Sequence, residues 1–167
     1  MALDVTVGTA TSTSYATVAE ADTIVAWKGS DAWTNAIDAT KESALTAAVS
    51  FMDTIAYELP RVTTGQALRL PTTSMYDNDG TLIVPERVKE AQSYLALALL
   101  EDPNIMGGGG SGPVSEVSVP GAFSVTFQDS SEDTLGLPRE VYARLERYIL
   151  RSGIPTSGGI YDVSRGG

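Results

Sequence analysis

Two long stretches with apolar residues at helical spacing constrain the fold of this 167-residue chain more than any other feature. The first is capped by Asp38 or Thr40 and runs to about Glu58, and the second starts near Pro85 and runs to about Glu101. Their apolar positions are Leu45, Ala48, Val49, Met52, Ile55 and Ala56 in the first, and Val88, Ala91, Leu95, Ala98 and Leu99 in the second. Both stretches are rich in Ala, which predicts two helices in close antiparallel contact.

Shorter helices are predicted on either side of this pair. Thr17 and Glu20 fit a capping box, which opens a helix that reaches about Lys28 and ends at Gly29. The next residues, Asp31-Ala32-Trp33, indicate a short turn of helix. A last helix is predicted after Pro138, and its apolar stripe consists of Val141, Leu145, Tyr148 and Ile149.

The remaining segments indicate loops, one hairpin and two arms. Residues 60–84 carry turn signals and predict a long irregular loop. Two runs rich in Val and Phe, separated by Pro120-Gly121, predict a β-hairpin over about 113–128. The predicted fold is therefore mainly α, a small helical bundle of about four helices with one β-hairpin and extended N- and C-terminal arms. We expect an arm at 1–16, the bundle with its inserted hairpin at 17–152, and a tail at 153–167.

The chain contains no histidine and no cysteine. Histidine is the side chain best suited to proton transfer near neutral pH and the commonest metal ligand, so its absence removes the usual catalytic triads. We therefore expect no enzymatic activity, no catalytic residue and no cofactor. The apolar run Ala96 to Leu100 is far short of the roughly 20 residues that a membrane span needs, and the N-terminal residues do not predict a secretory signal.

The net charge of −10 is unevenly distributed. Residues 138–167 carry five bases and three acids, whereas the other parts of the chain are acidic. Nucleic-acid binding draws most of its affinity from Lys and Arg side chains. The sequence lacks an excess of these residues except near its C-terminus. Trp27 and Trp33, close to Lys28, could stack on bases in a single-strand binder, but their place beside helices in an acidic half favours a role as core anchors.

A calcium loop is the one metal site that the sequence suggests. Asp77, Asp79 and Glu86 fall on ligand positions of the EF-hand template, with Gly80 at its turn position. The first ligand position, however, is Met75, which coordinates calcium poorly, and no amphipathic helix leads into the loop. An ordinary Asp-Gly turn is the preferred interpretation.

The tail at 153–167 mixes glycines with apolar residues that it cannot bury alone. Two interpretations stay open: a disordered end, or an arm that becomes ordered on a partner through its apolar residues. Arg151 and Arg165 would add attraction to an acidic partner surface.

The order of several short motifs resembles the head-completion adaptors, or head-tail connectors, of tailed bacteriophages. The matching segments are Ser14 to Asp22, Lys41 to Leu45, Met52-Asp53, Gln66 to Pro71, Ile83 to Ala91, Gly112 to Val117 and Leu137 to Ile149. Leu70 stands where that family usually has Trp, and Thr72 where it often has Arg. Some relatives are labelled DnaT-like single-stranded-DNA-binding proteins, a function against which the acidity of this chain argues.

This resemblance implies a structural protein of the virion neck, made in the host cytoplasm. It would form a ring, commonly of twelve copies, that binds the portal, extends the DNA channel without specific DNA binding, and docks the next neck or tail protein. The tail would hold the portal through Ile154, Ile160, Tyr161, Val163 and Arg165. The alternative function is a single-stranded-DNA-binding accessory protein.

Overall fold

The computed structural model describes residues 3–105, 116–119, 123–126 and 135–150, with only the backbone described at 116–119 and 123–126. Its elements are α1 (Val18–Val25), the 3-10 helix η1 (Ala26–Lys28), α2 (Asp31–Thr34), α3 (Asp38–Met52), α4 (Glu86–Glu101), β1 (Glu116–Val119), β2 (Phe123–Thr126) and α5 (Arg139–Leu145). The predicted mainly α fold is confirmed. None of the helices among these residues is long and apolar enough to cross a bilayer.

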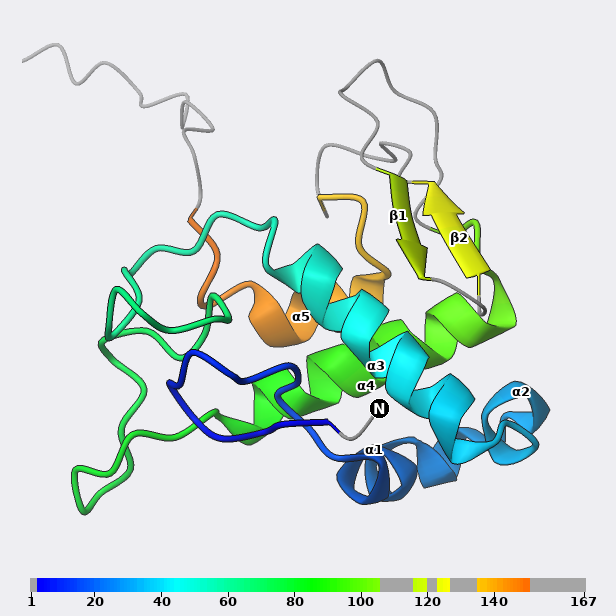
Figure 1. Cartoon of the computed structure of the whole chain (residues 1–167), viewed down its shortest axis with the longest axis horizontal. Helices are drawn as coiled ribbons and strands as arrows, with labels where there is room; N and C mark the ends of the chain where they lie inside the picture. Colours follow the sequence, from blue (N-terminus) through cyan, green and yellow to red (C-terminus); the bar gives the residue numbers. More distant parts are fainter. Residues whose placement is uncertain (1–2, 106–115, 120–122, 127–134, 151–167) are drawn as a thin grey trace, which may run out of the picture.

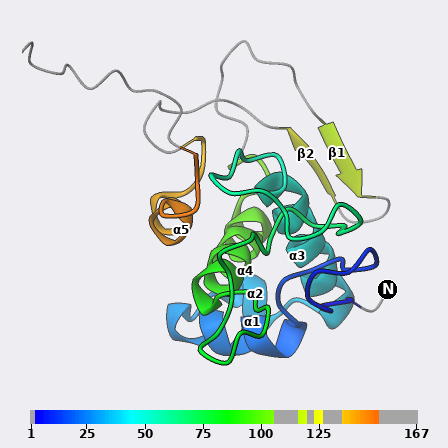
Figure 2. The same ribbon diagram turned by 90° about the vertical axis from the view of Figure 1, so that its left-hand side faces the viewer.

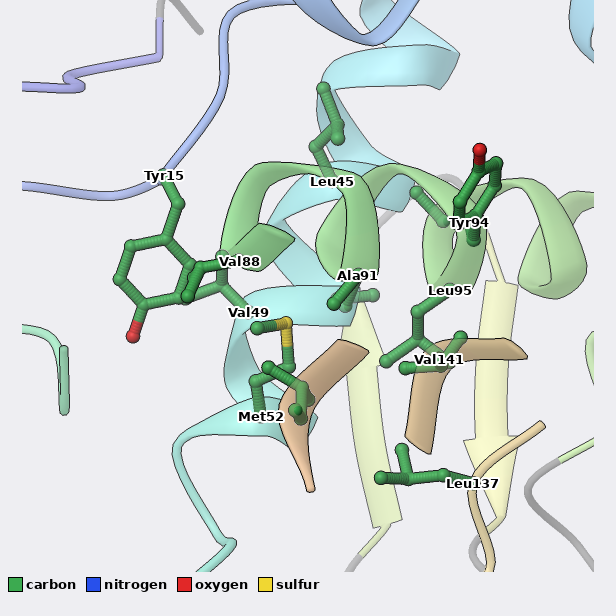
Figure 3. Close-up of a cluster of buried hydrophobic side chains, with 14 of the residues drawn as sticks. Tyr15, Leu45, Val49, Met52, Val88, Ala91, Tyr94, Leu95, Leu137 and Val141 are labelled. Carbon is green, nitrogen blue, oxygen red and sulfur yellow. The ribbon is translucent and has the colours of Figure 1, made fainter. Parts of the chain in front are cut away.

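Helices α3 and α4 cross at the centre of the molecule and run in opposite directions (Figure 1). Helices α1 and α2 lie against one end of this pair, and α5 lies along another side (Figure 2). The core forms where α3, α4 and α5 meet (Figure 3), and its labelled aliphatic side chains are Leu45, Val49, Met52, Val88, Ala91, Leu95, Leu137 and Val141. The predicted pairing of the two Ala-rich helices is confirmed, and both helices bury several alanines.

The start of α1 follows the predicted capping box. The Thr17 Oγ1 atom accepts the Glu20 N–H at 3.2 Å, and the Glu20 carboxylate accepts the Thr17 N–H at 2.8 Å. Gly29 ends η1 with a left-handed backbone, φ 59°, a conformation that a residue without Cβ adopts at little cost. Trp33 lies in α2, the predicted short turn of helix.

Both predicted ends of α3 were wrong. Ile37 is the capping residue, and neither Asp38 nor Thr40 caps the helix. The helix ends at Met52 because the chain turns there and places Ile55 and Tyr57 in the core. The Tyr57 hydroxyl then donates to the Met52 carbonyl at 3.0 Å, which satisfies one of the carbonyls left free at the helix end.

A short antiparallel bridge joins the segment after α3 to the segment after α5. Tyr57 pairs with Ile149, the Glu58 N–H donates to Tyr148 O at 2.9 Å, and the Leu150 N–H donates to Ala56 O at 2.8 Å. Helix α5 therefore stops at Leu145, and Ile149 reaches the core from an extended segment rather than from the predicted helix.

The two predicted β runs appear as β1 and β2, whose backbones pair antiparallel with Val117 opposite Val125. Residues 113–115, 120–122 and 127–128 lie outside the described residues, so the hairpin over 113–128 as a whole stays a prediction. The predicted loop at 60–84 is irregular and contains two isolated bridges, Arg61 to Thr72 and Tyr76 to Leu82.

Candidate functional site

A buried glutamine on α4 fixes the N-terminal arm to the helices. Gln92 is fully buried, and its Oε1 atom accepts the backbone N–H groups of Tyr15 at 3.0 Å and Ala16 at 2.9 Å. Its Nε2 atom donates to Ser14 Oγ at 2.7 Å and to the Leu45 carbonyl at 3.0 Å. Since all four hydrogen-bonding positions of this amide are filled, the group is structural and offers nothing to a ligand.

A second buried group joins the arm to α3 and the long loop. The Tyr15 hydroxyl donates to Asp53 Oδ1 at 2.9 Å and accepts the Leu70 N–H at 3.1 Å, while Asp53 Oδ1 also accepts the Arg69 N–H at 2.8 Å. Burial raises the pKa of Asp53 above its ordinary value, and burial likewise raises the pKa of Tyr15. Ser14, Tyr15, Asp53 and Leu70 belong to the motifs that carry the phage resemblance, so those motifs serve the scaffold.

The two tryptophans lie in opposite environments. Trp33 is 3% exposed and donates to Asp22 Oδ1 at 2.7 Å, which confirms its predicted role as a core anchor. Trp27 is 67% exposed, so the same prediction was wrong for this residue. It lies in η1, where the chain turns toward α2, and it contacts Tyr94 of α4.

Trp27 is held in a fixed orientation. Its Nε1 atom donates to the Tyr94 hydroxyl at 3.0 Å, and the two rings meet edge to face with centroids 6.2 Å apart and an angle of 83° between their planes. The Lys28 Nζ atom lies over the Trp27 ring at 4.7 Å and over the Tyr94 ring at 5.3 Å. The Lys28 cation therefore lies against the indole, while 67% of the surface of Trp27 is exposed and within reach of a planar ligand.

Two ion pairs surround these rings. Lys28 Nζ contacts the carboxylate of Glu140 on α5. The Arg144 guanidinium lies 4.4 Å from the Tyr94 ring centroid, and its Nε atom donates to Glu90 Oε2 at 2.8 Å. We call Trp27, Lys28, Glu90, Tyr94, Glu140 and Arg144 the Trp27 cluster, a surface formed where η1, α4 and α5 meet.

Two further cations lie at the start of α5 and just beyond its end. Arg139 is exposed and lines a shallow hollow of about 490 Å³ with Pro138, Glu140 and Ala143. Arg147 lies over the Tyr148 ring at 5.2 Å. Within the described part of the chain, neither Arg139 nor Arg147 takes part in an ion pair. Beside Glu140 of the Trp27 cluster, Arg139 therefore offers a cation that an anion can reach.

Only part of this surface was predicted from the sequence. The excess of bases after residue 138 indicated the cations of α5, and Trp27 with Lys28 was considered as a base-stacking group. Tyr94, Glu90 and Glu140 were missed. Tyr94 is the only aromatic residue in α4. A single aromatic residue among Ala and Leu was the sequence feature that could have pointed to it.

The other predicted sites do not form a binding surface. Asp77 Oδ1 accepts the backbone N–H groups of Asp79 at 2.9 Å and Thr81 at 2.8 Å, the pattern of a tight turn. Among the residues with described side chains, no three acids or other ligands converge as a metal site would require. The proposed portal-binding residues Ile154, Ile160, Tyr161, Val163 and Arg165 lie outside the described residues.

The chain matches one family model over residues 1–166, and that family is described as "Putative DnaT-like ssDNA binding protein". No curated protein and no solved structure matches the chain. The family match overturns the interpretation of the chain as a phage head-completion adaptor and structural neck protein. That interpretation failed because its short motifs lie in buried structural contacts. The portal, the neighbouring neck protein, the ring and the virion location were implied by the resemblance alone, and no described residue tests them.

Proposed function

We propose that this chain, which belongs to the family of DnaT-like single-stranded-DNA-binding proteins, binds single-stranded DNA on the Trp27 cluster. The observation that carries the proposal is the exposed indole of Trp27 beside the cations Lys28 and Arg144. An aromatic platform next to cations is the usual way in which a protein holds unpaired bases.

Stacking accounts for the preference for single strands. A base can lie flat on the exposed indole of Trp27, a contact that contributes about 1–3 kcal/mol per base and tolerates any sequence. Because Lys28 lies over the indole ring, Trp27 takes one base rather than inserting between two. In a duplex the base faces are covered by their neighbours, so the same contact requires a strand to be unstacked first.

The charges of the molecule determine where the DNA backbone can run. Lys28, Arg139 and Arg144 lie around the stacking face and can neutralise about three phosphates. The net charge of −10 repels DNA elsewhere, so binding is confined to this surface and is strong only at low salt. With three phosphates the slope of log K against log salt should be about −2.

Anisotropy titration of a labelled oligothymidylate at low salt tests the proposal. Trp27→Ala should weaken binding about tenfold or more, whereas Trp27→Phe, which keeps a stacking ring, should retain most of the affinity. Tyr76→Ala is the matched control, because Tyr76 is also an exposed aromatic residue but lies in the loop before α4. Equal affinities of wild type and Trp27→Ala would reject the cluster as the binding surface.

Intrinsic fluorescence gives an independent measurement. Stacking of a base on Trp27 should quench its emission, while the buried Trp33 should contribute an unchanged background. The Trp27→Phe protein retains Trp33 alone and should show no quenching at DNA concentrations that saturate the anisotropy signal. Quenching that persists in this variant would show that the stacking site is elsewhere.

A further inference from the structure

Both cations beside the stacking rings are occupied by carboxylates of the protein itself. Lys28 contacts Glu140, and the side chains are 24% and 38% exposed. Arg144 contacts Glu90, and these side chains are 27% and 33% exposed. A carboxylate oxygen and a phosphate oxygen accept the same charge-assisted hydrogen bonds, so these acids stand where DNA phosphates would bind.

Building on the proposed function, we propose that Glu140 and Glu90 are exchangeable counter-ions that limit the affinity for single-stranded DNA. In the free protein they occupy Lys28 and Arg144, and on binding they yield these cations to phosphates. The protein therefore carries its own competitor for each phosphate position, and the two acids determine how tightly DNA is held.

The partial exposure of both pairs is what makes them exchangeable. Ion pairs at this exposure contribute only about 0–1 kcal/mol, so a phosphate can replace the carboxylate at little cost. The pair of Lys41 with Asp22 differs, because the Lys41 side chain is only 10% exposed and Trp33 also donates to the same Asp22 oxygen. That pair belongs to the scaffold and is not expected to open.

The aromatic rings keep the cations in place when the acids leave. Lys28 lies over the rings of Trp27 and Tyr94, and Arg144 lies over the Tyr94 ring from the α5 side. These cation–π contacts do not involve either carboxylate. Exchange thus requires the rotation of two glutamate side chains and no movement of the helices.

Replacing Glu140 by its neutral isostere should tighten the binding of single-stranded DNA. Glu140→Gln keeps the size of the side chain and removes its charge, and the affinity for oligothymidylate should rise about fivefold. The matched control is Glu146→Gln, which removes the same charge from an exposed residue at the end of α5 that forms no ion pair among the described residues. Its effect should stay below twofold. Glu90→Gln should resemble Glu140→Gln because it releases Arg144.

A double-substitution cycle with Lys28→Met isolates the exchange from the general loss of negative charge. Without Lys28 there is no cation to release, so Glu140→Gln in that background should improve binding no more than Glu146→Gln does. Thermal melting checks that each variant is folded, which we expect because the buried Val141 and Leu145 hold α5 independently of Glu140.

The outcomes separate this inference from the function on which it rests. Tighter binding by Glu140→Gln that disappears with Lys28→Met supports exchange. Equal gains from Glu140→Gln and Glu146→Gln, or weaker binding by Glu140→Gln, would overturn it while the DNA-binding function stands. An absence of binding by wild type and all variants at low salt would overturn both.

Discussion

The buried network around Gln92 and the Trp27 cluster use similar chemistry in different surroundings. In the network, Gln92 and Tyr15 are buried and Asp53 is half-buried, and short hydrogen bonds connect them to the backbone and to each other's neighbours. In the cluster, Lys28 and Arg144 form pairs that solvent reaches. Removing the partner of a buried polar group costs much free energy because the group stays unpaired in a low dielectric. An exposed pair, in contrast, can change partner at little cost.

The first region is therefore suited to fixing the chain and the second to binding. The network joins the N-terminal arm, α3, α4 and the loop before α4, and its contacts leave no room for exchange. The cluster has an exposed indole and cations whose present partners are partly exposed glutamates. Substitutions should thus affect stability in the network and DNA affinity in the cluster.

The largest loss of stability is expected from a substitution at Gln92. Gln92→Leu removes the acceptor of two backbone N–H groups and a donor to the Leu45 carbonyl, all buried, at about 1–3 kcal/mol for each stranded group. The free energy of unfolding in urea should fall by about 4 kcal/mol. Ser93→Ala, a neighbouring buried position whose hydroxyl bonds within its own helix, should cost less than about 1 kcal/mol. Equal losses in the two variants would contradict the special role of Gln92.

A smaller loss is expected from Tyr15→Phe. The substitution keeps the ring but removes the donor to Asp53 and the acceptor of the Leu70 N–H. The buried Leu70 N–H and the half-buried Asp53 carboxylate each lose a partner, so the free energy of unfolding should fall by about 2 kcal/mol in a urea titration. DNA affinity should stay unchanged, and a large loss of affinity in the folded variant would connect the two regions.

The free energy of unfolding should also depend on pH through the Asp53 carboxyl. Its pKa is raised in the fold above its ordinary value of 3.8, so the folded state favours the protonated carboxyl. This group therefore stabilises the fold fully below pH 3.8, and the contribution is lost as the pH rises through the raised folded pKa. The difference in unfolding free energy between wild type and Asp53→Asn should fall over that window. A difference that rises with pH would contradict the burial effect.

The smallest effect on stability is expected in the cluster. Trp27→Ala removes a mostly exposed ring and one hydrogen bond to Tyr94, so the free energy of unfolding should change by less than about 1 kcal/mol. Circular dichroism melting measures this change. A loss as large as that of Gln92→Leu would show that Trp27 is part of the scaffold.

Hydrophobic spacing predicted the helices well but not their ends. The faces of α3 and α4 follow from the intervals between apolar residues, and the capping box placed the start of α1. The end of α3 could not be predicted because Ile55 and Tyr57 also suit a helix. Only contact with Ile149, far along the chain, draws Tyr57 into an extended bridge.

The functional surface was harder to predict because it combines residues from distant segments. The Trp27 indole is exposed only because η1 turns before α2, and Tyr94 joins it because α4 passes behind. Arg144 comes from a helix whose position depends on the core contacts of Val141 and Leu145. Sequence spacing gives the face of each helix, and it does not give the place where three helices meet.

The bridge between Tyr57 and Ile149 has a consequence for synthesis. Val141, Leu145 and Ile149 fill the core from the last part of the described chain, so α3 and α4 emerge from the ribosome with one side uncovered. A nascent or prematurely terminated chain that lacks these residues shows that apolar side to chaperones and proteases. Chaperones and proteases can thus distinguish a chain that has formed the Tyr57–Ile149 bridge from one that has not.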